Sequence, residues 1–339
     1  MNAPDLPLVS IVIPLRNEER YVGRCLQSLA QQDYSSERLE VLVVDGHSSD
    51  SSRMVVEDCA RRSPFPVRLL NNHRRITSSA LNIGIAAARG DVIGIASAHS
   101  WLAPDFVSQG VRLLCEREVD CVCGPIASVG EALVGRAIAL AMSHPFGVGD
   151  ARFRYSQREQ LVDAAAFALY RRGVFARVGG FDQGMKGDSD ADFHYRLTEM
   201  GGRILQSPRL QSFYFVRPTL RSLFRQYFDY GFTKLVVMRR YPHRIKARQL
   251  VPSLFVAALV GSGGAALVNG SGRRLLALVA GSYASASLVA STVVASRGGW
   301  RYMPFLPLAF ACLHFGYGLG LLAALGRWAV RWRGIPVMR

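Results

Sequence analysis

A short apolar run that ends in an acid is the feature that most limits how this chain can fold. Residues 41–44 read Val-Leu-Val-Val, and Asp45 follows them directly. A continuous apolar run of this kind, rich in valine, is typical of a strand that is buried on both faces. Because an open α/β sheet binds ligands at the carboxyl ends of its strands, Asp45 is predicted to face a ligand crevice. We expect Ser48, Ser49 or Asp50 to cap the helix that follows.

The same alternation of strand and helix repeats along the first hundred residues. Strands are predicted at 9–14, 67–70 and 91–96, and helices at 18–29 and 78–88. Pro14 is expected to end the first strand, because proline cannot donate to the ladder. This alternation predicts an α/β fold with a mostly parallel sheet and helices on both faces. A Rossmann-like domain that binds another ligand is the alternative, but no glycine-rich dinucleotide fingerprint follows the first strand.

Charge is divided unevenly along the chain. The 339 residues carry a formal net charge of +16, and no Asp or Glu follows Asp229. The 14 Lys and Arg residues beyond that position supply most of the excess, so the first part of the chain is nearly neutral. Nucleic acid is not an expected partner, because a protein that binds it clusters basic residues on the folded domain.

The basic tail contains three long stretches without charge. We expect a globular domain over 1–215, an amphipathic basic interface helix over 216–249 and a membrane domain over 250–339, with hydrophobic segments at 250–270, 275–296 and 302–326. Each segment reaches the roughly 20 apolar residues that a bilayer core requires. The helix expected between Thr219 and Arg240 is followed by further basic residues, a pattern that suits a bilayer with anionic head groups.

The first residues do not form a signal peptide, so the globular domain is expected in the cytoplasm and the protein in the cytoplasmic membrane as a multi-pass chain. Lys and Arg favour the cytoplasmic side of a membrane. Their positions favour two full crossings and a partial first segment, with only Arg297 and Arg301 outside.

Five segments of the chain carry a resemblance to a known family. In order they read VSIVIPLRNEE, VVDGHSSD, ALNIGIAAARGDVIGIASAHS, GGFD and SDADFHYRL. They resemble a family 2 glycosyltransferase of the GT-A fold, and are similar to the succinoglycan-biosynthesis type of bacterial exopolysaccharide glycosyltransferases. The resemblance covers about residues 8–250. It implies that 1–215 is a GT-A catalytic domain that binds a nucleotide-diphosphate sugar.

The resemblance also implies roles for the ends of the first strands. Pro14, Asn17 and Glu18 would border the base and ribose, and Asp45 would accept a hydrogen bond from the base. Arg75 would approach the diphosphate, since the planar guanidinium donates to phosphate in pairs. A solvated loop is the alternative for Arg75.

At the end of the fourth strand, Ser97-Ala98-His99 stands where most of the family has Asp-x-Asp and the succinoglycan type has Asp-Ala-His. The resemblance implies that His99 binds a divalent cation, Mn²⁺ or Mg²⁺, which neutralises the departing diphosphate. Ser97 would contribute only a hydroxyl to the nucleotide sugar, so cation affinity is expected to be lower than usual. The alternative is that His99 only makes hydrogen bonds at the strand end.

Acids cluster at the start of a helix predicted near residue 190. The resemblance assigns the general base of an inverting transfer to Asp190, with Ser189 in place of the preceding Glu and Asp192 as the fallback. The alternative is that Asp188 and Asp190 only cap the helix.

Two further segments can each be interpreted in two ways. Gly179-Gly180-Phe181-Asp182 is either an acceptor-side loop or an ordinary turn. Residues 143–163, with Arg152, Arg154 and Arg158, are either a lid or groove for a lipid diphosphate or a solvated basic loop.

The leading hypothesis is transfer of a hexose, for example from UDP-glucose, to a polyprenyl-linked glycan in cell-surface polysaccharide synthesis, together with polysaccharide-assembly partners. A polyprenyl-phosphate sugar synthase is the first alternative. A degenerate, non-catalytic GT-A scaffold is the second, favoured by Ser97 and Ser189.

Overall fold

A computed structural model describes residues 6–149, 151–185 and 187–333 of the chain. The chain divides into two compact units. Unit 1 contains the residues up to Ala127 and Arg152–Phe215, whereas unit 2 contains Ser128–Ala151 and the chain from Val216 onward. The segment 128–151 therefore belongs with the C-terminal helices, although unit 1 surrounds it in sequence. The roles expected for 1–215, 216–249 and 250–339 stay predictions.

Unit 1 is built on an eight-stranded sheet in the order β3-β2-β1-β4-β9-β6-β10-β8. The strands are β1 (Val9–Leu15), β2 (Leu39–Asp45), β3 (Val67–Asn71), β4 (Val92–Ile95), β6 (Cys121–Cys123), β8 (Gln160–Leu161), β9 (Ala168–Arg171) and β10 (Ile204–Gln206). The first four are mutually parallel, as are β6 and β10, whereas β9 and the edge strand β8 run antiparallel to their neighbours. The predicted mostly parallel α/β sheet is confirmed.

Pro14 does not end the first strand. β1 continues to Leu15, which pairs with Asp45 of β2. On its other side β1 pairs with β4 only from Val9 to Val12. Because Pro14 lies beyond that second ladder, its missing N–H removes no hydrogen bond from β4.

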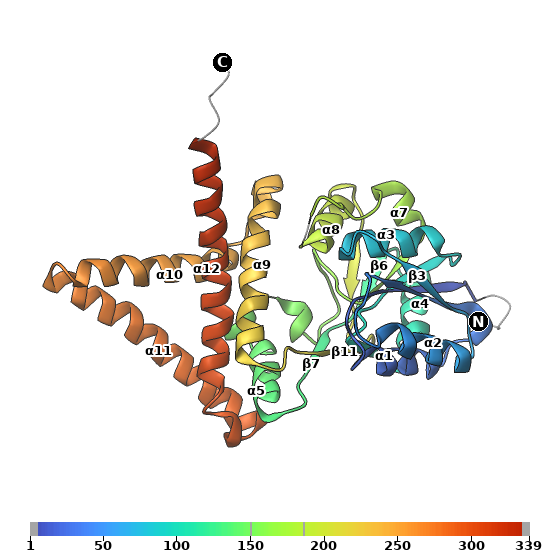
Figure 1. The fold of residues 1–339 in the computed structure, drawn as a ribbon, viewed down its shortest axis with the longest axis horizontal. Helices are drawn as coiled ribbons and strands as arrows, with labels where there is room; N and C mark the ends of the chain where they lie inside the picture. The colour runs from blue at the N-terminus through green and yellow to red at the C-terminus, as the bar shows by residue number, and fades with distance from the viewer. Residues whose placement is uncertain (1–5, 150, 186, 334–339) are drawn as a thin grey trace, which may run out of the picture. The chain divides into compact units, whose positions relative to one another are not determined.

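Helices cover both faces of this sheet (Figure 1). One face carries α1 (Val22–Ala30), α2 (Ser52–Arg62) and α4 (Phe106–Glu116), and the other carries α3 (Thr77–Ala87), α7 (Gly173–Val178) and α8 (Ser189–Glu199). Successive residues of β2 point to opposite faces, so Val41 and Val43 join the first core while Leu42 and Val44 join the second. This explains the unbroken apolar run of β2, since both of its faces are buried.

Three more strands and two short 3₁₀ turns complete this part of the chain. β5 (Ser100–Leu102) pairs antiparallel with β11 (Ser212–Phe215), and β7 (Ile126–Val129) lies at the boundary between the units. The 3₁₀ turns are η2 (Ser36–Arg38) and η3 (Arg152–Arg154).

Unit 2 is helical. Its elements are α5 (Leu133–Met142), α6 (Pro145–Val148), α9 (Leu220–Arg240), η4 (Pro242–Arg244), α10 (Ala247–Ala266), α11 (Gly270–Gly298), η5 (Trp300–Tyr302) and α12 (Leu306–Arg333). Three segments are long and apolar enough to cross a membrane: Ala247–Ala266, Gly270–Gly298 and Leu306–Ala329. The three apolar helices expected in the tail are confirmed, whereas residues 334–339 of the predicted membrane domain lie outside the described residues.

Close contacts bind the helices of unit 2 to one another. A Cβ added to Gly316 of α12 would lie 2.8 Å from the backbone oxygen of Phe224 in α9. A Cβ added to Gly320 would lie 2.1 Å from the backbone oxygen of Phe228 in the same helix. The backbones of α9 and α12 are therefore nearly in contact, as small residues permit. On α12, His314 Nε2 lies 2.7 Å from the Phe146 oxygen in α6, and its Nδ1 lies 3.0 Å from the Tyr283 hydroxyl in α11. α6 is thus hydrogen-bonded to α12, which is in turn hydrogen-bonded to α11.

Candidate active site

A cavity of about 290 Å³ lies in unit 1, beside the carboxyl ends of β1 and β4 and the start of α8. It contains three of the predicted site residues in its lining, Pro14, Ser97 and Asp190. The other residues that line it are Thr77, Ser78, Leu81, Ile95, Ala96, Ala165, Ala166, Phe167, Tyr170, Phe181, Met185, Gly187, Asp188, Ser189 and His194. The strand ends therefore converge on one hollow, as expected for an open α/β sheet.

Asp45 is buried at the end of β2, and both of its oxygens accept hydrogen bonds. Oδ1 accepts from the backbone N–H of Ser48 at 3.0 Å and from its hydroxyl at 2.6 Å, and Oδ2 accepts from Arg53 Nη1 at 2.7 Å. Burial alone would raise the pKa of Asp45, but the hydrogen bonds from Ser48 and Arg53 outweigh it and lower the pKa below its ordinary value. Asp45 is therefore a fixed carboxylate with lone pairs in addition to those already used.

The helix after β2 begins later than the sequence suggested. It starts at Ser52, whose backbone N–H donates to Asp50 Oδ1 at 3.0 Å, so Asp50 performs part of the expected capping. Ser48 and Ser49 do not cap, because their polar groups are used elsewhere. The Ser49 N–H donates to Asn17 Oδ1 at 2.8 Å, and the Ser48 hydroxyl accepts from the Asn17 N–H at 2.9 Å.

Asn17 thereby joins the loop after β1 to the loop after β2. It adopts a left-handed conformation with φ of 53°, which asparagine tolerates better than most residues. Its side chain is exposed at the same time as its Oδ1 is engaged. The structure places Asn17 near Asp45, but neither residue is among those that line the cavity.

His99 is held by Glu18, an acid from a different segment of the sequence. Its Nδ1 lies 2.9 Å from Glu18 Oε1 and 3.2 Å from the Ser97 hydroxyl. The other ring nitrogen, Nε2, lies 3.3 Å from the Ser97 hydroxyl, so Glu18 and Ser97 both contact the imidazole. The ring also meets the Tyr214 ring edge-on at a centroid distance of 5.0 Å. Glu18 therefore sets the orientation of His99, in the manner of a carboxylate behind a metal-binding imidazole.

The groups around Ser97 fit a divalent cation only as a partial ligand set. They offer an imidazole nitrogen, a hydroxyl and the Glu18 carboxylate, whereas manganese and magnesium prefer oxygen ligands. Within the described ranges, no cluster of three or more His, Cys, Asp and Glu side chains could hold a metal ion by itself. These residues suit an ion that receives most of its ligands from a bound diphosphate.

The acids at the start of α8 have different surroundings. Asp192 is completely buried, and its Oδ2 accepts from Arg196 Nε at 3.0 Å. Arg196 in turn donates to the oxygens of Val178 and Gly180 at 2.7 and 2.8 Å. Asp190 is exposed at the cavity, and its carboxylate makes no hydrogen bond or ion pair with any residue that the structure describes. Asp190 is therefore available to a substrate, and Asp192 fixes the loop before α8.

The Gly179-Gly180 turn requires its glycines. Gly179 has φ of 83°, and a Cβ on Gly180 would lie 2.6 Å from Asn82 Oδ1. The side chain of Asn82 makes two hydrogen bonds to the backbone of Phe181, which follows this turn. It donates to the Phe181 oxygen and accepts from the Phe181 N–H, both at 2.8 Å. The turn thus connects α3 to the loop that carries Asp190.

A buried pair of polar rings lies in the cavity wall. The Tyr170 hydroxyl and His194 Nε2 are 2.8 Å apart, and His194 Nδ1 is 3.5 Å from the Ala165 nitrogen. Burial lowers the pKa of His194 to about 4. A neutral ring that accepts at Nδ1 must carry its hydrogen on Nε2, so His194 donates to Tyr170.

Arg75 is exposed, has φ of 58° and is not among the residues that line the cavity. Its neighbour Arg74 donates to Gln183 Oε1 at 2.5 Å, which joins the loop before α3 to the loop before α8.

Arg53 and Asn82 were not predicted, although both fix residues of the site. No local pattern identifies them, because their partners are distant in sequence or separated by a turn.

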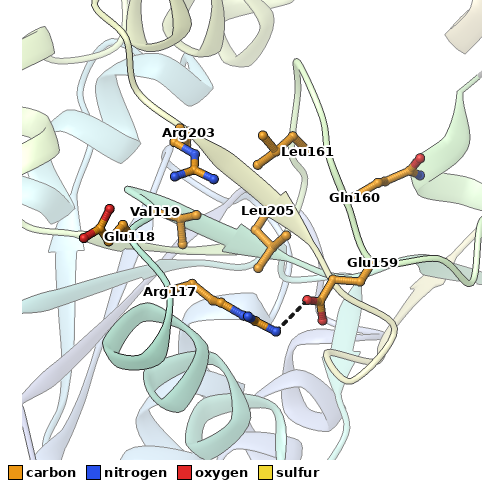
Figure 2. A pocket seen from close by; sticks show the side chains of 8 residues that line it. All are labelled: Arg117, Glu118, Val119, Glu159, Gln160, Leu161, Arg203 and Leu205. Carbon is orange, nitrogen blue, oxygen red and sulfur yellow. Dashed lines mark hydrogen bonds and ion pairs between the residues drawn. The ribbon is translucent and has the colours of Figure 1, made fainter.

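A second cavity, of about 310 Å³, lies at the opposite ends of the strands (Figure 2). Its lining includes Arg117 and Val119, which precede β6, and Arg203, which precedes β10. Arg117 is paired with Glu159 at 3.2 Å. Amino ends of parallel strands are not the usual place for ligands, and none of the predicted site residues lies here.

An open, mostly parallel sheet whose strand ends converge with the start of a helix on one cavity is the arrangement in which α/β proteins bind ligands. The chain belongs to glycosyl transferase family 2, whose model matches residues 10–179. The predicted family, the GT-A fold and the prediction that the chain is a glycosyltransferase are confirmed.

Two relatives and one solved structure illustrate this membership. The chain is 27% identical to the succinoglycan biosynthesis protein ExoA of Rhizobium meliloti, over 91% of this chain and 92% of the relative. It is 26% identical to the dolichyl N-acetyl-alpha-D-glucosaminyl phosphate 3-beta-D-2,3-diacetamido-2,3-dideoxy-beta-D-glucuronosyltransferase of Methanococcus voltae, over 68% of this chain and 74% of the relative. The fold is similar to that of the mannosyltransferase PcManGT from Pyrobaculum calidifontis, solved with GDP-Man and Mn²⁺, with a TM-score of 0.58, 20% identity and coverage of 95% and 88%.

Proposed function

We propose that this glycosyltransferase transfers a hexose from a nucleotide-diphosphate donor, with inversion, to a lipid-linked glycan during cell-surface polysaccharide synthesis. The observation that carries the proposal is the exposed Asp190 carboxylate in the same cavity as Pro14 and Ser97. Direct displacement at the anomeric carbon requires a base that takes the proton of the attacking hydroxyl. A carboxylate with no protein partner, on the side of the sugar away from the diphosphate, is suited to this role.

In this mechanism Asp190 accepts the proton of the acceptor hydroxyl as that oxygen attacks the sugar. It lies in the first turn of α8, at the edge of the cavity. The turn held by Asn82 and the Asp192–Arg196 pair keep the start of α8 in position. Asp190 is the proposed catalytic residue, and Asp192 is not.

At the other end, Asp45 and Asn17 form the wall for base and ribose, with Glu18 behind His99 and Pro14 and Ser97 bordering the sugar. Asp45 accepts from the base, because Ser48 and Arg53 hold it ionised and immobile. A divalent cation, held by His99 with help from Ser97 and Glu18, would supply positive charge to the leaving diphosphate. Arg75 is exposed beside this region and is proposed to reach the diphosphate in the loaded enzyme.

A lipid-linked acceptor is proposed from unit 2 and from the relatives. Three helices of unit 2 could span a membrane, and the relative from Methanococcus voltae is named for transfer to a dolichyl-linked sugar. We place the protein in the cytoplasmic membrane with the catalytic unit on the cytoplasmic side, where nucleotide sugars are made.

The test uses the full-length protein in nanodiscs with a panel of nucleotide sugars, with and without Mn²⁺, and a membrane lipid extract as acceptor. We expect one donor to be consumed, and the anomeric configuration of the product to be opposite to that of the donor. The Asp190→Asn variant should be inactive, whereas Glu199→Gln, which changes an exposed acid at the far end of α8, should be unaffected.

The alternatives give different results in the same assay. If a polyprenyl phosphate were the acceptor, Asp190→Asn would retain activity, because a phosphate is ionised without a base. If no donor were consumed with any metal, the protein would be a non-catalytic scaffold and the proposal would be wrong.

A further inference from the structure

Arg154 is a positive group that the proposed mechanism does not use. It ends the short turn η3 in unit 1, and its side chain is half-buried. Its Nη1 atom is buried and has no hydrogen-bond acceptor, and no carboxylate pairs with Arg154 among the residues that the structure describes. A guanidinium stays charged at any physiological pH, so a buried donor of this kind is costly unless something supplies an acceptor.

The surroundings of Arg154 connect it to the His99 end of the site. Its guanidinium lies 6.0 Å from the centre of the Tyr214 ring, and that ring meets His99 at 5.0 Å. Phe167, which lines the cavity, stacks on the same tyrosine at 6.4 Å. Tyr214 thus lies between Arg154, His99 and the cavity wall.

The position of Arg154 is fixed by the sheet. The buried side chain of Gln206 in β10 donates to the Ser156 oxygen at 3.0 Å, and the Ser156 N–H donates to the Arg152 oxygen at 2.7 Å. The other two arginines of this segment differ from Arg154, since Arg152 donates to Gln160 at 3.2 Å and Arg158 is exposed. Of these three arginines, Arg154 is the one with a buried donor that has no acceptor among the described residues, and it contacts Tyr214 beside His99.

The charges at this end of the site favour an anion. Ser97 stands where the family has an acid, and the Glu18 carboxylate is engaged with His99. Less negative charge is therefore present to attract a cation than an acid at position 97 would give, while a phosphate that enters would find a guanidinium without an acid partner among the described residues. Guanidinium groups suit phosphate because they donate two parallel hydrogen bonds to its oxygens.

We propose that Arg154 binds a phosphate group of a substrate beside His99 and supplies positive charge in addition to that of a cation, which Ser97 in place of an acid would hold only weakly. This inference rests on the proposed function, because that function brings phosphate to the cavity. The phosphate belongs either to the nucleotide donor or to the lipid-linked acceptor, and the chemistry of recognition is the same for both.

The test measures dissociation constants with the full-length protein in nanodiscs, without metal and with Mn²⁺. The probes are UDP, GDP, CDP, ADP and dTDP, the corresponding nucleosides, and undecaprenyl phosphate in the disc. Arg154→Gln is compared with wild type, with Arg154→Lys, and with the matched control Arg158→Gln, in which an exposed arginine of the same segment is changed.

If the phosphate is that of the donor, Arg154→Gln should weaken binding of the preferred nucleoside diphosphate at least tenfold and leave the nucleoside unchanged. If it is that of the acceptor, the same loss should occur for undecaprenyl phosphate and not for the nucleoside diphosphate. Arg154→Lys should lie between wild type and Arg154→Gln, because it keeps the charge and loses the fork, and Arg158→Gln should match wild type.

Wild-type affinity of Arg154→Gln for both kinds of ligand would overturn the inference. If Arg154→Gln fails to fold, Arg154→Lys decides the question by the same measurement. Failure of the wild-type protein to bind any nucleoside diphosphate would count against the proposed function instead, and inorganic pyrophosphate would then test Arg154 by itself.

Discussion

The two ends of the site in unit 1 are built in different ways. At the base end, Asp45 accepts three hydrogen bonds and Asn17 joins two loops, so the polar groups hold one another. At the transfer end, the Asp190 carboxylate is exposed and has no hydrogen bond or ion pair within the described part of the chain. The base end is held in place by its own contacts before a ligand arrives, whereas the transfer end presents an exposed carboxylate without a protein partner among the described residues.

This difference indicates a division of work. A preorganised end gives affinity, because little has to be ordered on binding. A carboxylate that no protein group engages is available to take a proton from the substrate. Substitutions at the base end should therefore change binding, and substitutions at the transfer end should change the rate.

The largest effect is expected for Asp190→Asn. Loss of the general base should lower kcat by about 10²–10⁴-fold, with little change in the dissociation constant of the nucleoside diphosphate. Single-turnover kinetics and calorimetry measure the two quantities. Asp192→Asn should behave differently and lower the melting temperature, because it removes the partner of Arg196 from a fully buried position. A near-normal rate for Asp190→Asn would remove the proposed contrast.

Asp45→Asn should weaken nucleoside diphosphate binding by about 30-fold, which corresponds to about 2 kcal/mol for a hydrogen bond to a charged group. The rate at saturating donor should change much less. Calorimetric titration gives the affinity, and Asp58→Asn on the surface of α2 is the matched control. An unchanged affinity would mean that Asp45 only organises its own loop.

Acid should destabilise unit 1 through His194. The pKa of this ring is about 4 in the folded protein, below the 6.5 of an ordinary histidine, so folding favours its neutral form. The resulting stability is fully present above pH 6.5 and is lost as the pH falls toward 4. Between pH 7 and pH 5 the loss should be about 2 kcal/mol.

The measurement is the unfolding midpoint in denaturant at the two pH values. His194→Gln should show a smaller decrease than wild type, whereas His73→Gln, at an exposed position, should show the full decrease. Equal decreases in all three proteins would contradict the assignment.

The smallest effect is expected for Glu18→Gln. A neutral amide orients His99 less well, so the Mn²⁺ concentration for half-maximal binding should rise about tenfold. Electron paramagnetic resonance of Mn²⁺ in the presence of a nucleoside diphosphate reports this without turnover. Glu19→Gln is the control, because Glu19 accepts from the Ser51 N–H and not from His99.

Much of the fold was accessible from the sequence, because strand and helix periods are local properties. The apolar run of β2, the helix expected between Thr219 and Arg240 and the three apolar stretches each correspond to an element of the structure. The boundary at Pro14 was wrong, because the order of strands decides which side of β1 needs a donor.

The site was accessible mainly through the resemblance, and the contacts that hold it were not. Glu18 and His99 are 81 residues apart, and no local pattern connects them. Asp190 and Asp192 look alike in sequence, and only burial separates them. The roles of the individual site residues stay predictions until the variants above are measured.

The assignment of residues 128–151 to unit 2 has a consequence for how this enzyme is prepared. The chain leaves unit 1 after Ala127, returns to it at Arg152 and leaves it again after Phe215. A single truncation therefore cannot separate the two units. A protein truncated after residue 215 would keep α5 and α6 but lose the α11 and α12 residues that bind them, including Tyr283 and His314. Such a fragment would expose apolar residues of α5 that are buried in the full protein, among them Ile138 and Met142, and should aggregate. Replacing 128–151 by a short polar linker in the same fragment should restore solubility.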